Sequence, residues 1–298
     1  MSRLSIVILN YGPTSIVTPC LESLKPDFDS GLAEVLVVDN GTPGFNAASL
    51  TDRFPWITVH PRSSNDGFAV GNNHGIERSG ADYVLLLNPD TTVDKGTMPA
   101  MVDFMEEHPD VGAATCRVDL KNGDIDPACH RGFPTPWASL FYFLKLDRLL
   151  PQCKLFGGYH LTYEDLTTTH DIDAPSGCFF LVRRRVIEQV GTLDEDYFMY
   201  GEDVDWAYRI KEAGWRIVYH PEVSIVHLKG MSSGIKSHSA TDSKARLEER
   251  RRAHRAFHDA MRIFYRKHYR KRHPIMVSWL VHVGIWLAER LRRRKLRV

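Results

Sequence analysis

The stretch Leu4–Leu9 (LSIVIL), with the turn residues 10–13 (NYGP) directly after it, decides how the fold of this chain is interpreted. A short apolar run that ends in turn residues is typical of a buried parallel strand. Ser15–Leu24 follows with apolar residues at helical spacing, and Glu34–Val38 (EVLVV) is a second buried run. The order strand, helix, strand predicts a βαβ unit at the N-terminus.

The alternation continues further along the chain. A third cycle consists of a strand at 57–60, the loop 65–73 (NDGFAVGNN), a helix to about Ser79 and the strand Tyr83–Leu87. Later strands are expected at 178–182, 216–219 and 224–227, with a helix at 184–190. Repeated alternation indicates an α/β fold with a doubly wound sheet.

The middle of the chain, from 117 to 173, is less regular. Within it, Trp137–Leu150 (WASLFYFLKLDRLL) has the pattern of an amphipathic aromatic helix. Packing in the core is the preferred interpretation of this segment. The alternative is a lid or a segment in contact with lipid.

Charge is distributed unevenly along the 298 residues, of which 43% are hydrophobic, enough for a substantial core. Residues 1–243 contain 20 Lys and Arg against 33 Asp and Glu, and residues 244–298 contain 18 against 4. The body therefore has a formal charge of −13 and the tail of +14. Such a tail is expected to meet an anionic membrane surface or a nucleic acid.

The cysteines indicate the compartment. The chain has 5 of them, widely spaced and without a C-x-x-C pair, and its first residues show no signal-peptide pattern. We expect reduced thiols in the cytoplasm.

Polar residues follow three of the expected strands, at Asn10 and Tyr11, at Asp39, and at Asn88 to Asp90. Ligands of doubly wound sheets bind beyond the carboxyl ends of the strands. We therefore expect one shared site, although each of these groups alone would be an ordinary turn. Asp90 is a candidate ligand of Mg²⁺ or Mn²⁺, because such ions commonly take one or two carboxylates and complete their shells with phosphate oxygens.

The stretch 197–209 (YFMYGEDVDWAYR) crowds Glu202, Asp203 and Asp205 between aromatic residues. Mutual repulsion and an apolar setting are expected to raise the pKa of at least one of these carboxyl groups. We interpret Asp203 as a catalytic base. The alternative is the start of a surface helix, where acids favour the helix dipole, and both interpretations can hold together.

Seven segments between about residues 5 and 234 occur in an order and at spacings that together are specific: SIVILNYG, VLVVDNG, NDGFAVGNNHG, YVLLLNPDT, PSGCFFLVRR, GTLDEDYFMYGEDVDWAYRIKEAGWRIVYHP and VSIVHLKGMSSG. In the order and spacing of these segments, the chain resembles the inverting family 2 glycosyltransferases with the GT-A fold. It is most similar to the bacterial branch that builds surface polysaccharides, where rhamnosyltransferases are frequent.

The resemblance implies a role for each matched residue. Asn10, Tyr11 and Asp39 would hold the nucleotide base and ribose. The donor pocket would also be lined by loop residues Asn65, Gly67, Phe68, Asn72 and Asn73.

The family's D-x-D motif is represented by Asn88-Pro89-Asp90, in which the first acid has become an amide, so metal affinity is expected to be lower. His227 matches a histidine that completes the metal shell in several relatives, and imidazole would suit Mn²⁺ better than Mg²⁺. A purely structural role for His227 is the alternative, with equal weight. Glu202 and Asp203 match the catalytic E-D motif.

The implied domains are a GT-A catalytic domain at 1–240 and a basic helical tail at 241–298. The catalytic domain would divide into a nucleotide-sugar-binding half, 1–116, and an acceptor and catalytic half, 117–240.

The implied reaction moves a sugar, L-rhamnose by analogy, from a dTDP- or UDP-linked donor to a hydroxyl of a glycan or polyprenyl-linked acceptor with inversion, in cell-surface polysaccharide synthesis. Galactofuranose, mannose and glucose are the alternative sugars, and a homo-oligomer is left open. A dinucleotide-dependent oxidoreductase is disfavoured because the first turn lacks G-x-G-x-x-G. A nucleic-acid-binding protein is disfavoured because the tail contains no recognised module for that task.

The tail is expected to hold a basic helix over Ala245–Tyr269, which could pack on the body, and an apolar segment over Ile275–Ala288. Fourteen helical residues reach roughly 21 Å, short of the ~30 Å hydrocarbon core, so spanning is not expected. One stripe of this helix is polar and consists of Ser278, His282 and Glu289. The apolar side chains outside the stripe would enter the lipid headgroups. They are Trp279, Leu280, Val283, Trp286 and Leu287. The protein would then be peripheral on the inner face of the plasma membrane. The alternative is a helix packed on the body or on a partner subunit.

Overall fold

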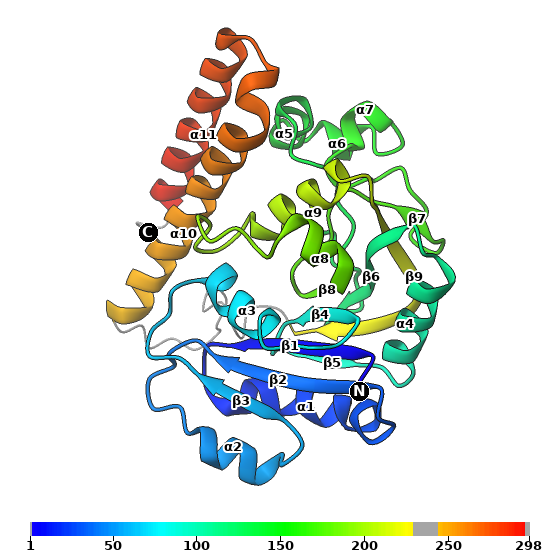
Figure 1. Cartoon of the computed structure of the whole chain (residues 1–298). Coiled ribbons are helices and arrows are strands. Elements are labelled where there is room, and N and C mark those ends of the chain that lie inside the picture. The colour runs from blue at the N-terminus through cyan, green and yellow to red at the C-terminus, as the bar shows by residue number, and fades with distance from the viewer. Residues whose placement is uncertain (1, 229–243, 296–298) are drawn as a thin grey trace.

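The computed structural model describes residues 2–228 and 244–295, and side chains at 2–228 and 251–291. In this part of the chain, nine strands form one mixed sheet in the order β3-β2-β1-β4-β8-β6-β9-β5, with β7 paired to β9 (Figure 1). The strands are β1 Leu4–Asn10, β2 Ala33–Asp39, β3 Thr58–Pro61, β4 Tyr83–Leu87, β5 Thr91–Val93, β6 Val111–Leu120, β7 His170–Asp171, β8 Phe179–Arg183 and β9 Arg216–His227.

Helices cover both faces of the sheet, with α1 and α2 on one side and α3, α8 and α9 on the other (Figure 1). The helices of the body are α1 Thr14–Asp29, α2 Ala47–Arg53, α3 Phe68–Ile76, α4 Thr97–Glu107, α5 Pro136–Phe143, α6 Leu146–Leu149, α7 Lys154–Gly157, α8 Arg184–Val190 and α9 Glu202–Glu212. The tail consists of α10 Lys244–Phe264, a π-helical turn at Tyr265–Tyr269, a 3₁₀ turn at Arg270–Arg272 and α11 Ile275–Lys295.

The N-terminal half of the sheet is parallel, as the alternating sequence predicted. β1 pairs in parallel with both β2 and β4, and all of its residues are buried. The register aligns Asn10 with Asp39, so two of the expected polar strand ends lie side by side at one edge of the sheet. The expected doubly wound α/β fold is confirmed, whereas the division of the catalytic domain at 116 and 117 stays a prediction.

One strand replaces the two that were expected at 216–219 and 224–227. β9 runs through both segments, but its register against β6 shifts between the pairs Cys116 with His220 and Arg117 with Ser224. Pro221 lies in this irregularity and has no backbone N–H to donate to the sheet. The bulge explains why the sequence pattern breaks there without ending the strand.

The preference for core packing of Trp137–Leu150 was wrong. Lys145 adopts a left-handed conformation, φ 58°, and separates α5 from α6. Most large apolar side chains of this segment are exposed, Trp137 by 57%. The segment therefore lies on the surface of the body, with only Ala138 and Asp147 buried.

The first half of the tail packs on the body through α9. His268 Nε2 lies 2.6 Å from Asp205 Oδ1, and Lys267 forms ion pairs with Asp194 and Asp196. Burial alone would raise the pKa of Asp205, but the His268 hydrogen bond and the Arg209 charge outweigh it and hold that pKa below its usual value. Asp205 thus anchors the tail, and the expected packing of the basic helix on the body is confirmed.

The second half of the tail packs on the first with its polar stripe. Ser278 Oγ lies 3.0 Å from the Tyr265 hydroxyl, the His282 ring is against the same tyrosine, and Glu289 pairs with Arg262. The opposite face of α11 is exposed, with Met276 at 75% and Trp279 at 65%. α11 therefore packs on protein, as the alternative interpretation predicted, and entry of its exposed apolar face into the lipid headgroups stays a prediction. Across residues 2–228 and 244–295, no helix is both long enough and apolar enough to cross a bilayer.

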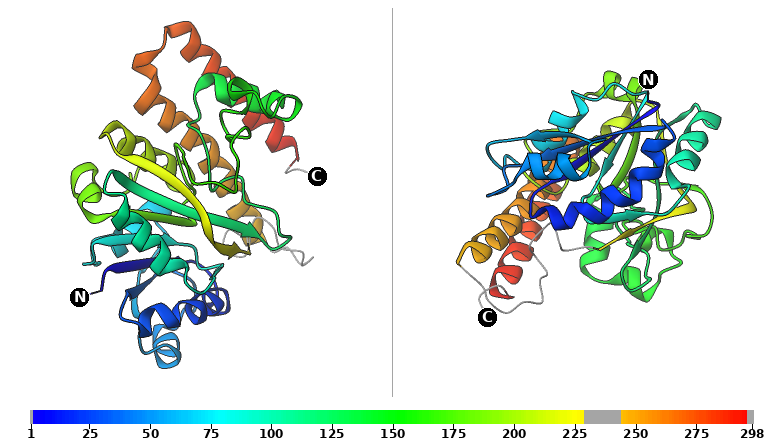
Figure 2. Two further views of the ribbon diagram at one scale, coloured as in Figure 1. Left: turned by 90° about the vertical axis from the view of Figure 1, so that its right-hand side faces the viewer. Right: turned by 90° about the horizontal axis from the view of Figure 1, so that it is seen from below.

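The tail helices and the irregular middle of the body meet at one end of the molecule. α5 lies beside α10 and α11 in both figures, and residues of all three line one groove (Figures 1 and 2). Every large hydrophobic side chain that is exposed within the described residues belongs to 137–155 or 275–291. The exposed apolar surface is therefore gathered at this end.

Candidate functional site

The expected nucleotide end of the site is built on two neighbouring strand ends. Asn10 Nδ2 donates to Asp39 Oδ1 over 3.2 Å, and the backbone N–H of Thr42 donates to Asp39 Oδ2 over 3.0 Å. Asn10 and Asp39 are both buried, and Tyr11 beside them is half-buried. A carboxylate accepts up to about four hydrogen bonds, so Asp39 retains capacity for an N–H or O–H of a ligand.

The loop before α3 is fixed by its own hydrogen bonds. Asn65 Oδ1 accepts from the Gly67 N–H and from Asn40 Nδ2, both over 3.1 Å. Gly67 has φ 108°, and a Cβ there would lie 2.4 Å from the Phe198 carbonyl oxygen. The close approach that requires glycine is thus to the segment before α9, and it ties the loop to the acidic stretch.

Phe68 and Asn73, both expected to line the donor pocket, lie in different settings. The Phe68 ring packs against Gly177, which in turn adjoins the Asp203 side chain. Asn73 is buried, and its amide exchanges hydrogen bonds with the backbone of Leu193 and donates to Glu195. Phe68 therefore borders the acidic pair, while the role of Asn73 toward a donor stays a prediction.

The acidic pair lies in the first turn of α9, which begins after Gly201 at φ 85°. Asp203 Oδ1 accepts from the Val204 N–H over 2.8 Å, and Oδ2 accepts from the Gly177 N–H over 3.3 Å. The carboxylate thus lies at the positive end of the helix dipole and is fixed by two backbone N–H groups. The two sequence interpretations, helix start and acidic site, describe the same structure.

Sequence reasoning missed the residue that holds Asp203. Arg131 comes from the irregular middle of the chain, and its Nη2 donates to Asp203 Oδ2 over 2.7 Å and to the Pro175 carbonyl over 2.7 Å. Burial alone would lower the pKa of Arg131, but the charge of Asp203 keeps it above its usual value. The partners are 72 residues apart, and no local pattern marks Arg131.

Glu202 is the carboxyl group whose pKa rises, as crowding predicted for one member of the stretch. Burial raises its pKa well above the usual value, and the nearby charge of Asp203 raises it further. Its Oε2 is buried and has no hydrogen-bond partner within the described residues. The two adjacent carboxyl groups therefore lie in different settings, with Glu202 buried and Asp203 held by Arg131.

A second group of side chains gathers where β4 and β9 end. His227 Nε2 lies 3.3 Å from Asp90 Oδ1 and 3.4 Å from Asn88 Nδ2, and His227 Nδ1 lies 3.6 Å from Asp126 Oδ2. Burial alone would lower the pKa of His227, but hydrogen bonds with Asp126 and Asp90 outweigh it and raise the pKa to about 12. The structure thus brings the two expected metal ligands together and adds Asp126 behind the imidazole.

The donor atoms of Asp90 and His227 fit a divalent cation. Adjacent ligands of an octahedral ion at about 2.1 Å lie about 3 Å apart, close to the 3.3 Å between Asp90 Oδ1 and His227 Nε2. Across residues 2–228 and 251–291, no group of three or more His, Cys, Asp and Glu side chains is placed to hold a metal. Most of the shell would come from phosphate oxygens and water, as is usual for ions that meet nucleotides.

Known proteins of similar sequence are glycosyltransferases. The N-acetylglucosaminyl-diphospho-decaprenol L-rhamnosyltransferase of Mycobacterium tuberculosis is 27% identical over 259 residues, 78% of each chain. The rhamnosyltransferase WbbL of Escherichia coli is 25% identical over 232 residues, 74% of this chain and 82% of that protein. The low-salt glycan biosynthesis hexosyltransferase Agl10 of Haloferax volcanii is 27% identical over 236 residues, 76% of this chain and 67% of that protein.

Solved structures show the same fold. A mannosyltransferase from Pyrobaculum calidifontis, in complex with GDP-mannose and Mn²⁺, aligns with a TM-score of 0.54 at 16% identity, over 96% of this chain and 69% of that one. GalNAc-T7, with UDP, GalNAc and Mn²⁺, aligns with a TM-score of 0.57 at 14% identity, over 85% of this chain and 47% of that one. Residues 2–256 match the family described as glycosyltransferase like family 2. The chain therefore belongs to glycosyltransferase family 2 and has the GT-A fold with a helical C-terminal tail.

Proposed function

We propose that this glycosyltransferase transfers L-rhamnose from a nucleoside-diphosphate donor to a hydroxyl of a lipid-linked glycan, with inversion at the anomeric carbon. The observation that carries the proposal is the Asp203 carboxylate, which is fixed by Arg131 and adjoins Gly177, as does the Phe68 ring of the donor loop. Rhamnosyltransferases among the relatives support the sugar, and the decaprenol-linked substrate named for the mycobacterial relative supports the acceptor. The proposed donor carries the sugar on dTDP or UDP.

In the proposed reaction, Asp203 accepts the proton of the acceptor hydroxyl as that oxygen attacks the sugar. Its carboxylate has lone pairs beyond those used by Arg131, Gly177 and Val204. The rigid partners hold the base in one orientation, which lowers the entropy lost on reaching the transition state. Burial raises the pKa of the neighbouring Glu202 well above its usual value, and Asp203 is the member of the pair that Arg131 holds.

Asp90 and His227 would hold a divalent cation, Mg²⁺ or Mn²⁺, which would neutralise charge on the departing diphosphate. Asn88 would hydrogen-bond the donor through its amide, and Asp39 would accept from the base or ribose. Asn10 keeps the Asp39 carboxylate in place through the 3.2 Å hydrogen bond between their side chains.

A peripheral position on the inner face of the membrane belongs to the same proposal. Lipid-linked acceptors present their hydroxyls at a membrane surface, and the large exposed hydrophobic side chains of the described residues are confined to 137–155 and 275–291. The tail that contains the second of these ranges is also rich in cations, because residues 244–298 have 18 Lys and Arg. Apolar residues at the headgroups together with cations facing anionic lipid are what an interfacial helix requires.

The decisive experiment is a panel of nucleotide sugars assayed by nucleoside-diphosphate release, with a lipid-linked N-acetylglucosamine acceptor. Release from dTDP-rhamnose that depends on both acceptor and divalent metal is expected, and the anomeric configuration of the product should be inverted. Release from another sugar would replace rhamnose by galactofuranose, mannose or glucose. A product that retains the donor's configuration would overturn the proposed role of Asp203.

A further inference from the structure

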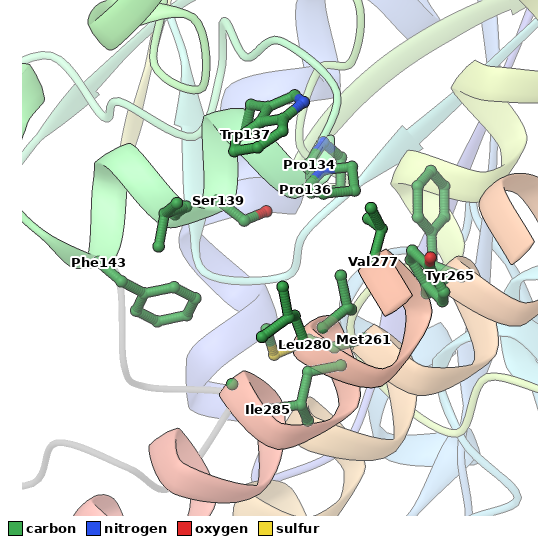
Figure 3. Close-up of a pocket in the computed structure, with 14 residues that line it drawn as sticks. Pro134, Pro136, Trp137, Ser139, Phe143, Met261, Tyr265, Val277, Leu280 and Ile285 are labelled. Atoms are coloured by element: carbon green, nitrogen blue, oxygen red, sulfur yellow. The ribbon is translucent and has the colours of Figure 1, made fainter. Parts of the chain in front are cut away.

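An apolar groove lies between the body and the tail. α5 forms one wall, and α10 and α11 form the other (Figure 3). The groove has a volume of about 220 Å³. Prolines, aromatic rings and branched aliphatic side chains line it, among them Pro136, Trp137, Phe143, Met261, Leu280 and Ile285.

The lining offers little to a polar ligand. Its side-chain hydroxyls are those of Ser139 and Tyr265, and the Tyr265 hydroxyl already lies 3.0 Å from Ser278 Oγ. Such a surface favours a hydrocarbon occupant, because apolar area removed from water is the main gain available there.

Both walls of the groove are connected to the acidic site, one along the chain and the other through α9. Pro134 of the lining follows three residues after Arg131, whose guanidinium contacts Asp203. On the other side, Phe264 of the lining packs edge-on against Tyr208, which lies on α9 together with Asp203. One wall of the groove therefore contacts α9, the helix that carries the expected base in its first turn.

The outer rim of the groove belongs to the exposed apolar end of the molecule. Trp137 and Phe143 are exposed on one wall, and Leu280 is exposed on the other. The groove is thus continuous with the expected membrane-facing surface. A lipid of the bilayer carries no group that must reach Asp203, whereas the acceptor carries, beyond its diphosphate, a sugar whose hydroxyl must.

We propose that this groove binds the isoprenoid chain of the lipid-linked acceptor. The inference rests on the proposed function and adds the place where the lipid is recognised. The chain would leave the bilayer between α5 and α11, and its diphosphate would project toward α9. Its methyl branches would contact the prolines and rings of the lining, and the tail's cations would face the anionic headgroups around it.

Gly284 allows a test that fills the groove without disturbing the fold. It lies on α11 and lines the groove, and a Cβ built there meets no atom within 4 Å. Leu and Ala both favour a helix over Gly, so Gly284→Leu and Gly284→Ala should both fold. Only Gly284→Leu adds enough bulk to occupy the groove, and Gly284→Ala is its matched control.

Binding is measured with the full-length protein by calorimetry, using geranylgeranyl diphosphate, inorganic diphosphate and a straight-chain alkyl diphosphate of similar length. Wild type and Gly284→Ala should bind geranylgeranyl diphosphate with Kd values within twofold of each other. Gly284→Leu should bind it at least tenfold more weakly. Inorganic diphosphate should bind equally to all three proteins.

Equal binding of geranylgeranyl diphosphate by Gly284→Leu and Gly284→Ala would overturn the proposal. Equal affinity for the branched and straight chains would also overturn it, because the groove would then accept bilayer acyl chains. A second variant on the facing wall, Ser139→Leu, should reproduce the loss seen with Gly284→Leu, and unchanged binding there counts against the groove.

The binding assay needs no sugar transfer, so the two proposals can fail separately. If the protein binds the isoprenoid in the groove but releases no nucleotide from any donor, the function is wrong and the groove stands. If Gly284→Leu and Gly284→Ala transfer sugar equally well to a lipid-linked acceptor, the groove is wrong and the function stands.

Discussion

Arg131 Nη2 donates a 2.7 Å hydrogen bond to Asp203 Oδ2, which joins the irregular middle of the chain to the first turn of α9. Both side chains are largely buried, so the ion pair is shielded from salt and solvent. The pair neutralises one of two adjacent acids and leaves the other, Glu202, with a raised pKa. Asp203 is thereby held in one orientation as a hydrogen-bond acceptor.

Changing Asp203 to Asn should lower turnover by about 10²–10⁴-fold, the usual contribution of a positioned acid–base group. Donor binding should stay nearly unchanged, because Asp39 and Asp90 would carry it. Turnover is measured by nucleoside-diphosphate release at saturating donor, and donor affinity by calorimetry.

The stability of the Asp203→Asn variant must be measured as a control, so that a loss of turnover is not mistaken for unfolding. The substitution leaves Arg131 without its charged partner, and a broken buried pair costs about 3–5 kcal/mol. Asn still accepts a hydrogen bond, so a smaller loss is expected, to be checked by thermal melting. A folded variant that turns over within a few-fold of wild type would exclude Asp203 as the base.

Changing Glu202 to Gln should stabilise the protein increasingly as the pH rises. The pKa of Glu202 is higher in the folded state than its ordinary value of 4.5, so the folded state holds a proton that the unfolded state releases. Wild-type stability from this group is present below about pH 4.5 and is lost as the pH rises toward the folded-state pKa. Gln has no proton to lose.

The measurement for Glu202→Gln is denaturant unfolding of both proteins between pH 5 and 8. The difference in unfolding free energy should grow by up to about 1.4 kcal/mol per pH unit in favour of the variant. A difference that is constant with pH would show that Glu202 is charged in the folded protein.

Changing Asp90 to Ala should abolish metal-dependent donor binding, because the amide of Asn88 cannot replace the lost charge beside a diphosphate. Calorimetric titration of the donor with and without Mn²⁺ measures this. Asp124→Asn, an exposed acid near Asp126, is the matched control and should bind donor as wild type does. If Asp90→Ala binds donor as tightly as the control in both conditions, the metal site lies elsewhere.

Asp126 should act through His227. Metal-bound histidines usually donate their other ring nitrogen to a carboxylate, and Asp126 Oδ2 lies 3.6 Å from His227 Nδ1. Asp126→Asn should lower Mn²⁺ affinity by about 10–100-fold, the usual effect of such a partner, as measured by electron paramagnetic resonance of bound Mn²⁺. Unchanged Mn²⁺ binding would leave His227 and Asp126 as a structural pair.

Local patterns predicted β1, β2, β3, β4, β8 and β9 and the polar strand ends, because a buried parallel strand needs a continuous apolar run and its end needs turn residues. They did not predict β5, β6 or β7. Local patterns could not reveal Arg131 or Asp126. Both lie in a proline-rich segment without periodicity, and their partners Asp203 and His227 come from the second half of the chain. The same limit explains the error at Trp137–Leu150, since amphipathic periodicity shows that a face is apolar but not what covers it.

The exposed apolar face of α11 should attach the protein to anionic membranes. Met276 and Trp279 are among its most exposed side chains, and the polar stripe that includes His282 faces α10. Full-length protein should float with anionic vesicles and be released at high salt, because headgroup attraction is screened. The double variant Met276→Ser, Trp279→Ser loses roughly 2 kcal/mol of apolar transfer free energy, so its partitioning onto vesicles should fall at least about tenfold.

His282→Ser on the same helix is the control and should float as wild type does. Flotation of the double variant equal to that of the control would place the membrane contact elsewhere, and failure of all three proteins to float with vesicles at low salt would rule out attachment through the tail.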